Sequence, residues 1–252
     1  MPALLSVNIN KYALLRNSRG RNTPDLLRAA DLCLAAGAHG ITVHPRLDER
    51  HVRLDDLAPL HAHLAAHHPG VELNVECAAD PRIVGPVCAL RPAQCTLVPV
   101  RPGEVTSDHG WDLPAESARL APVVAALRAA GVRVSLFMEV EAGDAALAAA
   151  RALGADRVEL YTGPFAWAWG TPGAAAATAA CFAFAARAAA AGLALNAGHD
   201  LDRHNLRALA ALPGLAEVSI GHAQIVRALD VGTTQSVREL REALGHPVPG
   251  LG

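Results

Sequence analysis

The sequence predicts a closed (β/α)8 barrel, and three observations lead to that fold class. Short β-branched runs alternate with longer stretches rich in Ala and Leu, which indicates parallel strands joined by crossover helices. Eight such units fit into 252 residues, the usual size of an eight-stranded barrel. The turn after the first predicted strand reads NINKYALLRN and lacks the GxGxxG signature of an open doubly wound sheet, the alternative fold.

Each predicted strand is a short and mostly apolar run. In chain order the predicted strands are Leu4–Ile9, Gly40–His44, Glu72–Cys77, Gln94–Val100, Arg133–Val140, Arg157–Thr162, Leu193–Gly198 and Ala216–Gly221. Seven of the eight units show a clear helical pattern before the next strand, as in the stretches that begin at Pro24, Glu116 and Asp144. The exception is PRIVGPVCALRP, which is short and interrupted by Pro86. The Ala-rich stretch Gly173–Gly192 reads as a helix that packs closely on a neighbour.

Composition and charge exclude several classes of protein. The net charge of −2 gives no electrostatic footprint for nucleic acid, and no stretch approaches the roughly 20 apolar residues of a membrane span. The start of the chain, MPALLSVNINKY, lacks the pattern of a signal peptide. Five cysteines without a CxxC motif indicate reduced thiols rather than disulfides or a zinc knuckle. We therefore expect a cytoplasmic protein, with residues 1–252 forming one catalytic barrel domain because no linker divides the chain.

Polar side chains stand at the carboxyl ends of most predicted strands, where barrels of this kind carry their active sites. These side chains are Asn8, Asn10, Lys11, His44, Arg46, Glu76, Glu139, Glu159, Tyr161, Asn196, His199 and His222. A single polar side chain at such a position is more often a core residue whose hydrogen bonds are made within the protein. Because an unpaired buried polar group is costly, convergence from many strands indicates an active site built for proton transfer.

The seventh and eighth predicted loops carry a signal for phosphate. Both read Gly-His and then run into a helical pattern, at Gly198-His199 and at Gly221-His222. Helix N-termini offer free N–H groups and the positive end of the helix dipole, and glycine lets the backbone approach an anion closely. These two loops are also the usual phosphate site of the fold.

Further candidates for anion binding lie in three other loops. The basic residues after the first two predicted strands are Arg16, Arg19, Arg21, Arg46, Arg50 and His51. Arginine binds phosphate through a bidentate fork. The loop GEVTSDHGWD after the fourth predicted strand offers the Thr106 hydroxyl, and its length and paired glycines suggest a lid over bound substrate.

Taken together, these segments resemble the pyridoxine 5′-phosphate synthase family, the ring-closing enzymes of vitamin B6 biosynthesis. The segments that carry the resemblance are SVNINKYALLRNSRG, GAHGITVHPRLDERH, LNVE, TLVPVRPGEVTSDHGWD, VSLFME, VELYTG, NAGHDL and SIGHA. They follow the family order over nearly the whole chain. The combination of GITVHPR-x4-H with NAGH and IGHA is the most specific part.

The resemblance implies an activity and an assembly. The implied reaction condenses 3-amino-2-oxopropyl phosphate with 1-deoxy-D-xylulose 5-phosphate, and the products are pyridoxine 5′-phosphate, inorganic phosphate and water. The resemblance implies a (β/α)8 barrel with a few extra helices, no metal and no organic cofactor. It also implies a homo-oligomer, usually an octamer.

The resemblance further implies a role for each matched position. His44 and Glu76 match proton acceptors, His199 matches the proton donor, and Glu159 matches an acidic residue that stabilises a transition state. The positions that match contacts to the aminoketone phosphate are Asn8, Arg19, Asp200, Gly221 and His222. Those that match contacts to the deoxyxylulose phosphate are Arg46, His51 and Thr106. Many family members read Asn-Ile-Asp-His after the first strand, whereas this chain has Asn10 and Lys11, which keep hydrogen-bonding groups but change the charge.

Two other functions remain open from the sequence. A metal-dependent barrel hydrolase or aldolase would use His44, Glu76, His199 and His222 as ligands, but such hydrolases commonly carry His-x-His where this chain reads Asn8-Ile9-Asn10. A non-catalytic phosphosugar-binding relative is suggested by the change at Asn10 and Lys11. Against it, a protein that only binds its ligand has no need of a full set of proton-transfer groups. His39, His61, His63, His67, His68, His204 and His246 read as surface or capping residues, and His109, in the predicted lid, stays undecided.

Overall fold

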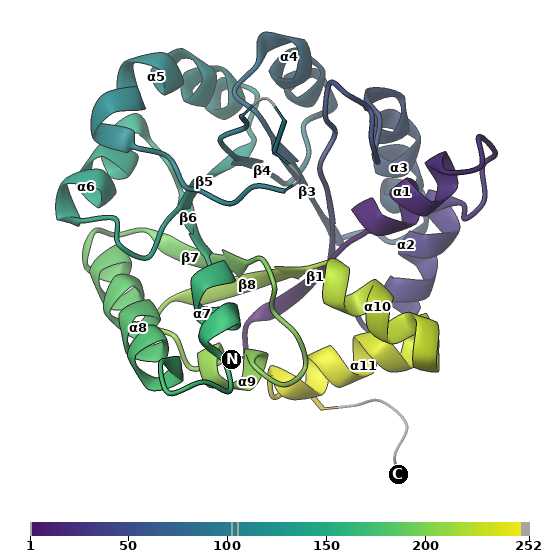
Figure 1. Cartoon of the computed structure of the whole chain (residues 1–252). Coiled ribbons are helices and arrows are strands. Elements are labelled where there is room, and N and C mark those ends of the chain that lie inside the picture. Colours follow the sequence, from purple (N-terminus) through teal and green to yellow (C-terminus); the bar gives the residue numbers. More distant parts are fainter. Residues whose placement is uncertain (1, 102, 105, 248–252) are drawn as a thin grey trace.

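The chain folds into a closed barrel of eight parallel strands, in a computed structural model that describes residues 2–101, 103–104 and 106–247. The strands pair in chain order, and β8 pairs with β1 to close the ring. Figure 1 shows the helices arranged around the outside of the barrel. The predicted barrel is therefore confirmed, and the open doubly wound alternative is wrong.

The element bounds follow the predicted alternation closely. The strands are β1 (Leu4–Asn8), β2 (Gly40–Val43), β3 (Glu72–Cys77), β4 (Gln94–Leu97), β5 (Arg133–Met138), β6 (Arg157–Tyr161), β7 (Ala194–Gly198) and β8 (Leu215–Ile220). The helices are α1 (Asn10–Asn17), α2 (Leu26–Ala35), α3 (Leu54–His67), α4 (Pro81–Leu90), α5 (Leu113–Ala129), α6 (Asp144–Leu153), α7 (Gly163–Ala168), α8 (Ala174–Ala190), α9 (Leu206–Leu209), α10 (His222–Val231) and α11 (Thr233–Ala243). All eight predicted strands are present.

Helix α4 forms in the segment where the helical pattern is weakest. Asp80 accepts a hydrogen bond from the backbone N–H of Arg82 at 2.9 Å, and Pro81 occupies the first turn, where its missing N–H costs nothing. Pro86 removes one hydrogen bond inside the helix. Ile83, Val84 and Val87 are buried, and this apolar face stabilises the helix despite the proline.

The outer face of the barrel is apolar. Side chains along a strand point alternately to its two sides, and Leu5, Val7, Ile41 and Val43 are fully buried between the strands and the surrounding helices. This pattern explains the short apolar runs in the sequence. The residues between them are polar and point the other way, into the barrel.

A ladder of hydrogen bonds joins the first four strands inside the barrel. Ser6 Oγ lies 2.7 Å from Thr42 Oγ1, and Asn74 Nδ2 donates to the same Thr42 oxygen at 3.5 Å. Thr96 Oγ1 donates to Asn74 Oδ1 at 3.2 Å. All four side chains are buried. Many barrels of this fold fill the interior with branched aliphatic residues, so a polar interior depends on hydrogen bonds such as these for its stability.

Two ion pairs cross the barrel interior. Arg133 on β5 donates to Glu72 on β3 at 3.2 Å, and Arg157 NH1 on β6 lies 3.6 Å from Glu217 Oε2 on β8. The first contact passes over β4 and the second over β7. Both pairs lie on the inner side of the barrel, because the outer side is covered by helices. Arg157 also donates to Asn196 on that intervening strand at 3.1 Å. The amino-terminal part of the barrel is therefore filled by paired charges.

The structure bears on the expected lack of a membrane span and of disulfides. Within residues 2–101, 103–104 and 106–247, no helix is long and apolar enough to cross a membrane. All five cysteines are free thiols, as predicted. Cys77 and Cys95, on neighbouring strands, have their sulfur atoms 3.6 Å apart.

We predict that Asn74→Ala destabilises the protein by about 2–4 kcal/mol. The substitution leaves the Thr42 and Thr96 hydroxyls without their partner and opens a void between β2 and β4. Urea unfolding measures the change. The control Gln235→Ala on the exposed surface of α11 should stay within about 0.5 kcal/mol of the parent protein. Equal effects of the two substitutions would show that the internal ladder does not stabilise the barrel.

Candidate active site

Asn8, His44 and Glu76 form a cluster at the carboxyl ends of β1, β2 and β3. Asn8 Nδ2 donates to Glu76 Oε2 at 3.3 Å, and His44 Nδ1 lies 3.5 Å from the same oxygen. His44 and Glu76 are buried. His44 Nε2 is buried without a hydrogen-bond partner among the described residues. One imidazole nitrogen thus faces a carboxylate while the other is left for a ligand, the arrangement of a proton-transfer pair.

Asn10 fixes the position of His44. The backbone N–H of Asn10 donates to Asn8 Oδ1 at 3.0 Å, and Asn10 Oδ1 accepts from the backbone N–H of His44 at 2.8 Å. Asn10 therefore ties the end of β1 to the end of β2, and its side-chain oxygen is engaged with protein. Sequence reasoning placed Asn10 only as a substrate contact and missed this bond. Lys11 follows in the first turn of α1 and is partly exposed.

Glu159 lies deep in the barrel on β6, only 2% exposed. Burial raises the pKa of its carboxyl well above the ordinary value, and the nearby Glu76 and Glu217 raise it further. Gly198 on the neighbouring strand makes room for it, since a Cβ there would lie 2.7 Å from Glu159 Oε1. Glu159 Oε2 has no hydrogen-bond partner among the described residues. A carboxyl in such a site keeps its proton to a higher pH and acts as a hydrogen-bond donor.

His199 and Asp200 follow β7 in a strained turn. Their φ angles are +77° and +56°, a left-handed conformation that side chains other than glycine seldom adopt. Thr162 Oγ1 donates to the carbonyl oxygen of His199 at 2.6 Å, and Trp167 Nε1 donates to Asp200 Oδ2 at 3.0 Å. Asn205 Nδ2 donates to the Asp200 carbonyl at 3.1 Å. Contacts from α7 and from the loop before α9 thus hold the turn.

Aromatic rings enclose the His199 imidazole. Its ring centroid lies 5.0 Å from that of Phe137 and 5.5 Å from that of Tyr161, which meets it edge-on. Burial lowers the pKa of His199, while Glu76 and Asp200 act in the opposite direction. Sequence reasoning missed Phe137, Thr162 and Trp167 as supports of this histidine. Only 4% of the chain is aromatic, yet Tyr161 and Trp167 both lie at the end of the sixth strand or just after it. This local enrichment was the signal in the sequence that could have identified them.

One sequence-based interpretation of the seventh loop is wrong. No helix begins at Gly198-His199, and the next helix is the short α9, from Leu206 to Leu209. The intervening residues form a side-chain-capped turn, in which Asp202 Oδ1 accepts from the backbone N–H of His204 at 2.7 Å. Asp202 Oδ1 also accepts from the backbone N–H of Asn205 at 2.9 Å, and this local bonding competes with a helix, so helix N-terminal N–H groups are not presented here.

The eighth loop has the predicted strand-to-helix junction. Gly221 precedes α10, which begins at His222 and leaves the N–H groups of its first turn without intrahelical partners. A Cβ at Gly221 would lie 2.9 Å from the backbone oxygen of Asn8, so glycine is required where α10 meets the end of β1. This end of the helix lies beside the Asn8 cluster and suits an anion.

Arg46 and His51 lie in the loop after β2. Arg46 is buried, and its NH1 donates to Glu104 Oε1 at 3.4 Å across to the loop after β4. His51 Nδ1 accepts from the backbone N–H of Val52 at 3.0 Å, and the His51 ring lies 6.0 Å from that of His44. Burial lowers the pKa of His51 to about 3, with further lowering from His44, Arg46 and Lys11.

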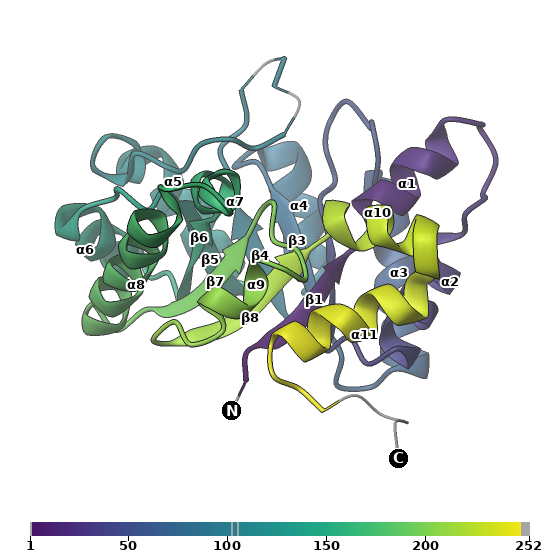
Figure 2. The same cartoon turned by 60° about the horizontal axis from the view of Figure 1, so that its bottom comes forward.

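The structure does not bring every predicted residue to the cluster. Arg19 and Thr106 are exposed, and in the described part of the chain neither contacts Asn8, His44 or Glu76. Arg19 lines an open hollow with Ser18 and Arg21. Figure 2 shows the loops after α1, β2 and β4 rising at the end of the barrel opposite the N-terminus. The predicted lid includes Val105, which lies outside the described residues, and it stays a prediction.

The residues of the alternative metal centre do not converge. Among the described residues, side chains able to hold a metal come together only in Asp31–His63–His68 and in Glu104–Asp108–His109. His44, Glu76, His199 and His222 form no such group. The geometry of these four therefore does not support a metal-dependent hydrolase.

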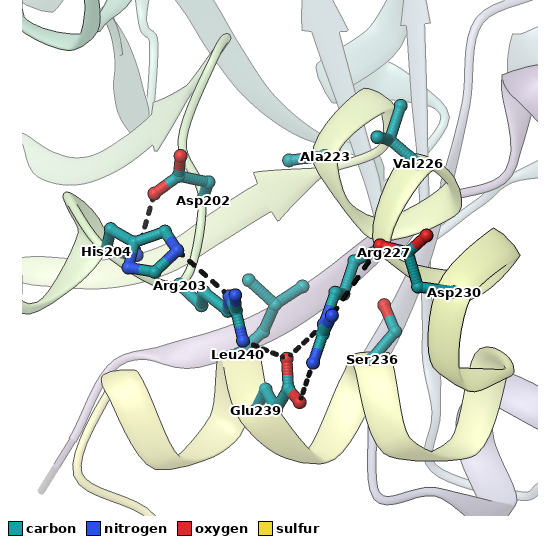
Figure 3. Close-up of a pocket in the computed structure, with 10 residues that line it drawn as sticks. All are labelled: Asp202, Arg203, His204, Ala223, Val226, Arg227, Asp230, Ser236, Glu239 and Leu240. Atoms are coloured by element: carbon teal, nitrogen blue, oxygen red, sulfur yellow. Dashed lines mark hydrogen bonds and ion pairs between the residues drawn. The ribbon is translucent and has the colours of Figure 1, made fainter.

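A surface hollow of about 200 Å³ lies apart from this cluster, between α10, α11 and the loop after β7 (Figure 3). Glu239 stands between two arginines there, accepting from Arg227 Nε at 2.9 Å and from Arg203 NH1 at 3.2 Å. None of the predicted catalytic residues lines it. These ion pairs tie the loop after β7 to the two C-terminal helices.

Comparison with known proteins gives a consistent result. The family described as "Pyridoxal phosphate biosynthesis protein PdxJ" matches residues 5–246. The pyridoxine 5′-phosphate synthase of Albidiferax ferrireducens is 51% identical over 94% of this chain and 96% of its own length. That of Xanthomonas axonopodis pv. citri is 52% identical over 98% of this chain and 99% of its own length.

Solved structures are similar in fold alone. Tryptophan synthase from Mycobacterium tuberculosis has a TM-score of 0.67 at 15% identity, covering 98% of this chain and 94% of that one. Tryptophan synthase subunit alpha from Legionella pneumophila has a TM-score of 0.66 at 14% identity, covering 96% and 93%. At this level of identity the likeness supports the barrel and carries no argument about chemistry.

We predict that His51→Gln weakens the acid sensitivity of the fold. The folded-state pKa of His51 is about 3, below the ordinary 6.5, so the unfolded chain binds this proton more readily. The resulting loss of stability develops as pH falls from about 6.5 toward 3, and the variant should lose less stability between pH 7 and pH 5. Urea unfolding at the two pH values measures the difference.

A second histidine provides the companion variant. Burial lowers the pKa of His39 to about 4, helped by His246 and Arg241, and His39 Nδ1 accepts the backbone N–H of Leu5 at 3.0 Å. The double variant His39→Gln with His51→Gln should show a flatter pH dependence than either single variant. If His51→Gln keeps the full pH dependence of the parent, the assignment to His51 is wrong.

Proposed function

The chain belongs to the family of the pyridoxal phosphate biosynthesis protein PdxJ, and we propose that it catalyses the reaction of its pyridoxine 5′-phosphate synthase relatives. The proposed substrates are 3-amino-2-oxopropyl phosphate and 1-deoxy-D-xylulose 5-phosphate. The observation that carries the proposal is the cluster of His44 and Glu76, at the same barrel end as His199 and above Glu159. These four side chains would supply proton acceptors and donors around a substrate at the carboxyl end of the barrel.

The proton-transfer roles follow from the surroundings of each group. Glu76 and His44 accept protons, because they form a paired unit whose outer nitrogen, Nε2, is left free for substrate. Glu159 donates a hydrogen bond, because its burial favours the protonated carboxyl. Burial also makes the imidazolium of His199 a stronger acid than free histidine, which suits a group that passes a proton to a leaving hydroxyl. Under this proposal, the site holds an acid and a base at the same pH.

Two phosphate positions complete the proposal. The N–H groups of Gly221 and His222 at the start of α10, with Asn8, Arg19 and the backbone of Asp200, would hold the aminoketone phosphate. Anchoring both substrates in reacting geometry lowers the barrier by about 7–11 kcal/mol in well-oriented systems.

The second position would hold the deoxyxylulose phosphate near His51. Burial is the main cause of the lowered pKa of His51, and the cationic Arg46 and Lys11 lower it further while Asp48 opposes them, so two positive charges lie near this histidine. Such a field suits a phosphate dianion. Asn10 and Thr106 complete the proposed contacts, Asn10 through its side-chain nitrogen because its oxygen already accepts from His44. Glu104 neutralises part of the charge on Arg46 and would have to give way to the phosphate.

We further propose that the protein works in the cytoplasm as a homo-oligomer, in the family's usual octamer. Helices α1 and α10 contact each other, and both expose large apolar side chains. Leu15 on α1 is 53% exposed, and Leu229 on α10 is 79% exposed. Leu14 on α1 and Val226 on α10 are also exposed. An exposed patch of this kind is typical of a surface covered by another subunit.

The direct test is to mix the two substrates with the purified protein and to detect pyridoxine 5′-phosphate. We expect turnover from the parent protein and none from His199→Asn, because the amide cannot shuttle a proton. Asparagine tolerates the left-handed backbone at this position, so the turn should survive. Substrate binding, measured by calorimetry, should be largely retained in this variant. Binding of both substrates without turnover in the parent protein would favour the non-catalytic relative instead.

A pair of glutamate variants tests the assigned protonation states. Glu76→Gln should lower turnover by about 10²- to 10⁴-fold, because the amide cannot accept a proton. Glu159→Gln should lose less activity than Glu159→Ala, because the neutral amide keeps a hydrogen-bond donor of nearly the same shape. The control Glu141→Gln changes an exposed glutamate outside the site. If Glu159→Gln is as inactive as Glu159→Ala, Glu159 acts as a charged group and the assignment is wrong.

A further inference from the structure

Two helices on the outside of the barrel bring three metal-binding side chains together. Asp31 lies on α2, His63 lies on α3, and His68 is the residue that caps the C-terminal end of α3. His63 Nε2 and His68 Nε2 each lie 2.7 Å from the same atom, Asp31 Oδ1. Two imidazoles therefore converge on one carboxylate oxygen from residues 32 and 37 positions away in the chain.

The backbone at this place is well fixed. The N–H of His68 donates to the carbonyl of Leu64 at 2.8 Å, and the His68 carbonyl accepts from the N–H of Val71 at 3.1 Å. Leu64 itself is buried in the core. Anchored elements thus present the two histidines and the aspartate, and the side chains of His63, His68 and Asp31 are 18%, 24% and 44% exposed.

The spacing of the ligand atoms suits a small divalent ion. The three candidate ligand atoms all lie within 4.8 Å of one another. A tetrahedral zinc ion with bonds of about 2.0–2.2 Å separates its ligand atoms by about 3.4 Å. Opening each nitrogen–oxygen contact from 2.7 Å to that spacing requires only small rotations of partly exposed side chains.

The electrostatics of the place favour a cation. Asp31 supplies a carboxylate oxygen, the negatively charged ligand of the group. The three side chains also lie near the C-terminal end of α3, where the helix dipole is negative. His67, four residues after His63, adds another imidazole with its ring centroid 4.6 Å from that of His63.

We propose that Asp31, His63 and His68 bind one divalent transition-metal ion of the zinc type, with water or His67 in the fourth position. Imidazole nitrogen and carboxylate oxygen are the ligands that this class of ion prefers. The bound ion would join α2 to α3 on the outside of the barrel, so its role is to stabilise the fold. The site is separate from the proposed reaction, because none of its residues belongs to the Asn8, His44 and Glu76 cluster.

Titration calorimetry with zinc chloride tests the site on tag-free protein that has been stripped with a chelator and desalted. We expect one zinc ion per chain, and at least tenfold weaker binding in each of Asp31→Asn, His63→Gln and His68→Gln. The control His61→Gln removes a histidine of the same helix and should bind as the parent does. Asp108→Asn, which disrupts the Glu104–Asp108–His109 group, should also leave the binding unchanged.

A second measurement separates metal loss from misfolding. Zinc should raise the thermal midpoint of the parent protein and of His61→Gln but not that of His68→Gln, because only a folded chain with the site intact gains from the ligand. Circular dichroism of the metal-free variants checks that they fold. Absence of stoichiometric zinc binding in the parent would overturn the proposal. Zinc binding that survives in His63→Gln and His68→Gln, or that disappears in Asp108→Asn, would overturn it as well.

Discussion

The polar interior of the barrel is the constraint on which the rest of the structure depends. The side chains that face the helices are apolar. The inner side of each strand carries hydroxyls, amides and charged groups, which depend on hydrogen bonds to one another. Ser6, Thr42, Asn74 and Thr96 do so as a ladder, and Arg133 and Arg157 do so by reaching over a strand to Glu72 and Glu217. Because these bonds require one register between neighbouring strands, they also fix the level at which each strand ends and presents its last polar side chain.

The same interior sets the chemistry of the site above it. Burial raises the pKa of Glu217 to about 7, and Arg157 opposes this shift. The carboxyls of Glu76 and Glu217 both lie near Glu159, and together with burial they raise its pKa. On the other side, strain of about 1–3 kcal/mol per residue in the turn of His199 and Asp200 is held by Thr162, Trp167 and Asn205. The stable barrel thus supports both the left-handed turn at His199 and Asp200 and the raised pKa of Glu159.

Much of the fold and the chemistry could be predicted from the sequence, because strand alternation and polar strand ends are local patterns. Helix α4 was obscured by Pro86, since burial of Ile83 and Val87 is a tertiary effect. No helix follows Gly198 directly, because the Asp202 side chain accepts hydrogen bonds from nearby backbone N–H groups. The tie from Asn10 to His44 and the meeting of His63 and His68 at Asp31 both join segments more than thirty residues apart, which no local pattern reveals.

The contact between Gly198 and Glu159 also has a consequence for how sequences of this fold can diverge. A Cβ at position 198 would lie 2.7 Å from Glu159 Oε1, so a side chain there requires the Glu159 carboxyl to move or to be shortened, and the two positions are coupled. A shortened residue at 159 would in turn forfeit the buried acid. Mutational drift at position 198 is therefore restrained by the chemistry on the neighbouring strand, although Gly198 itself offers no side chain to a substrate.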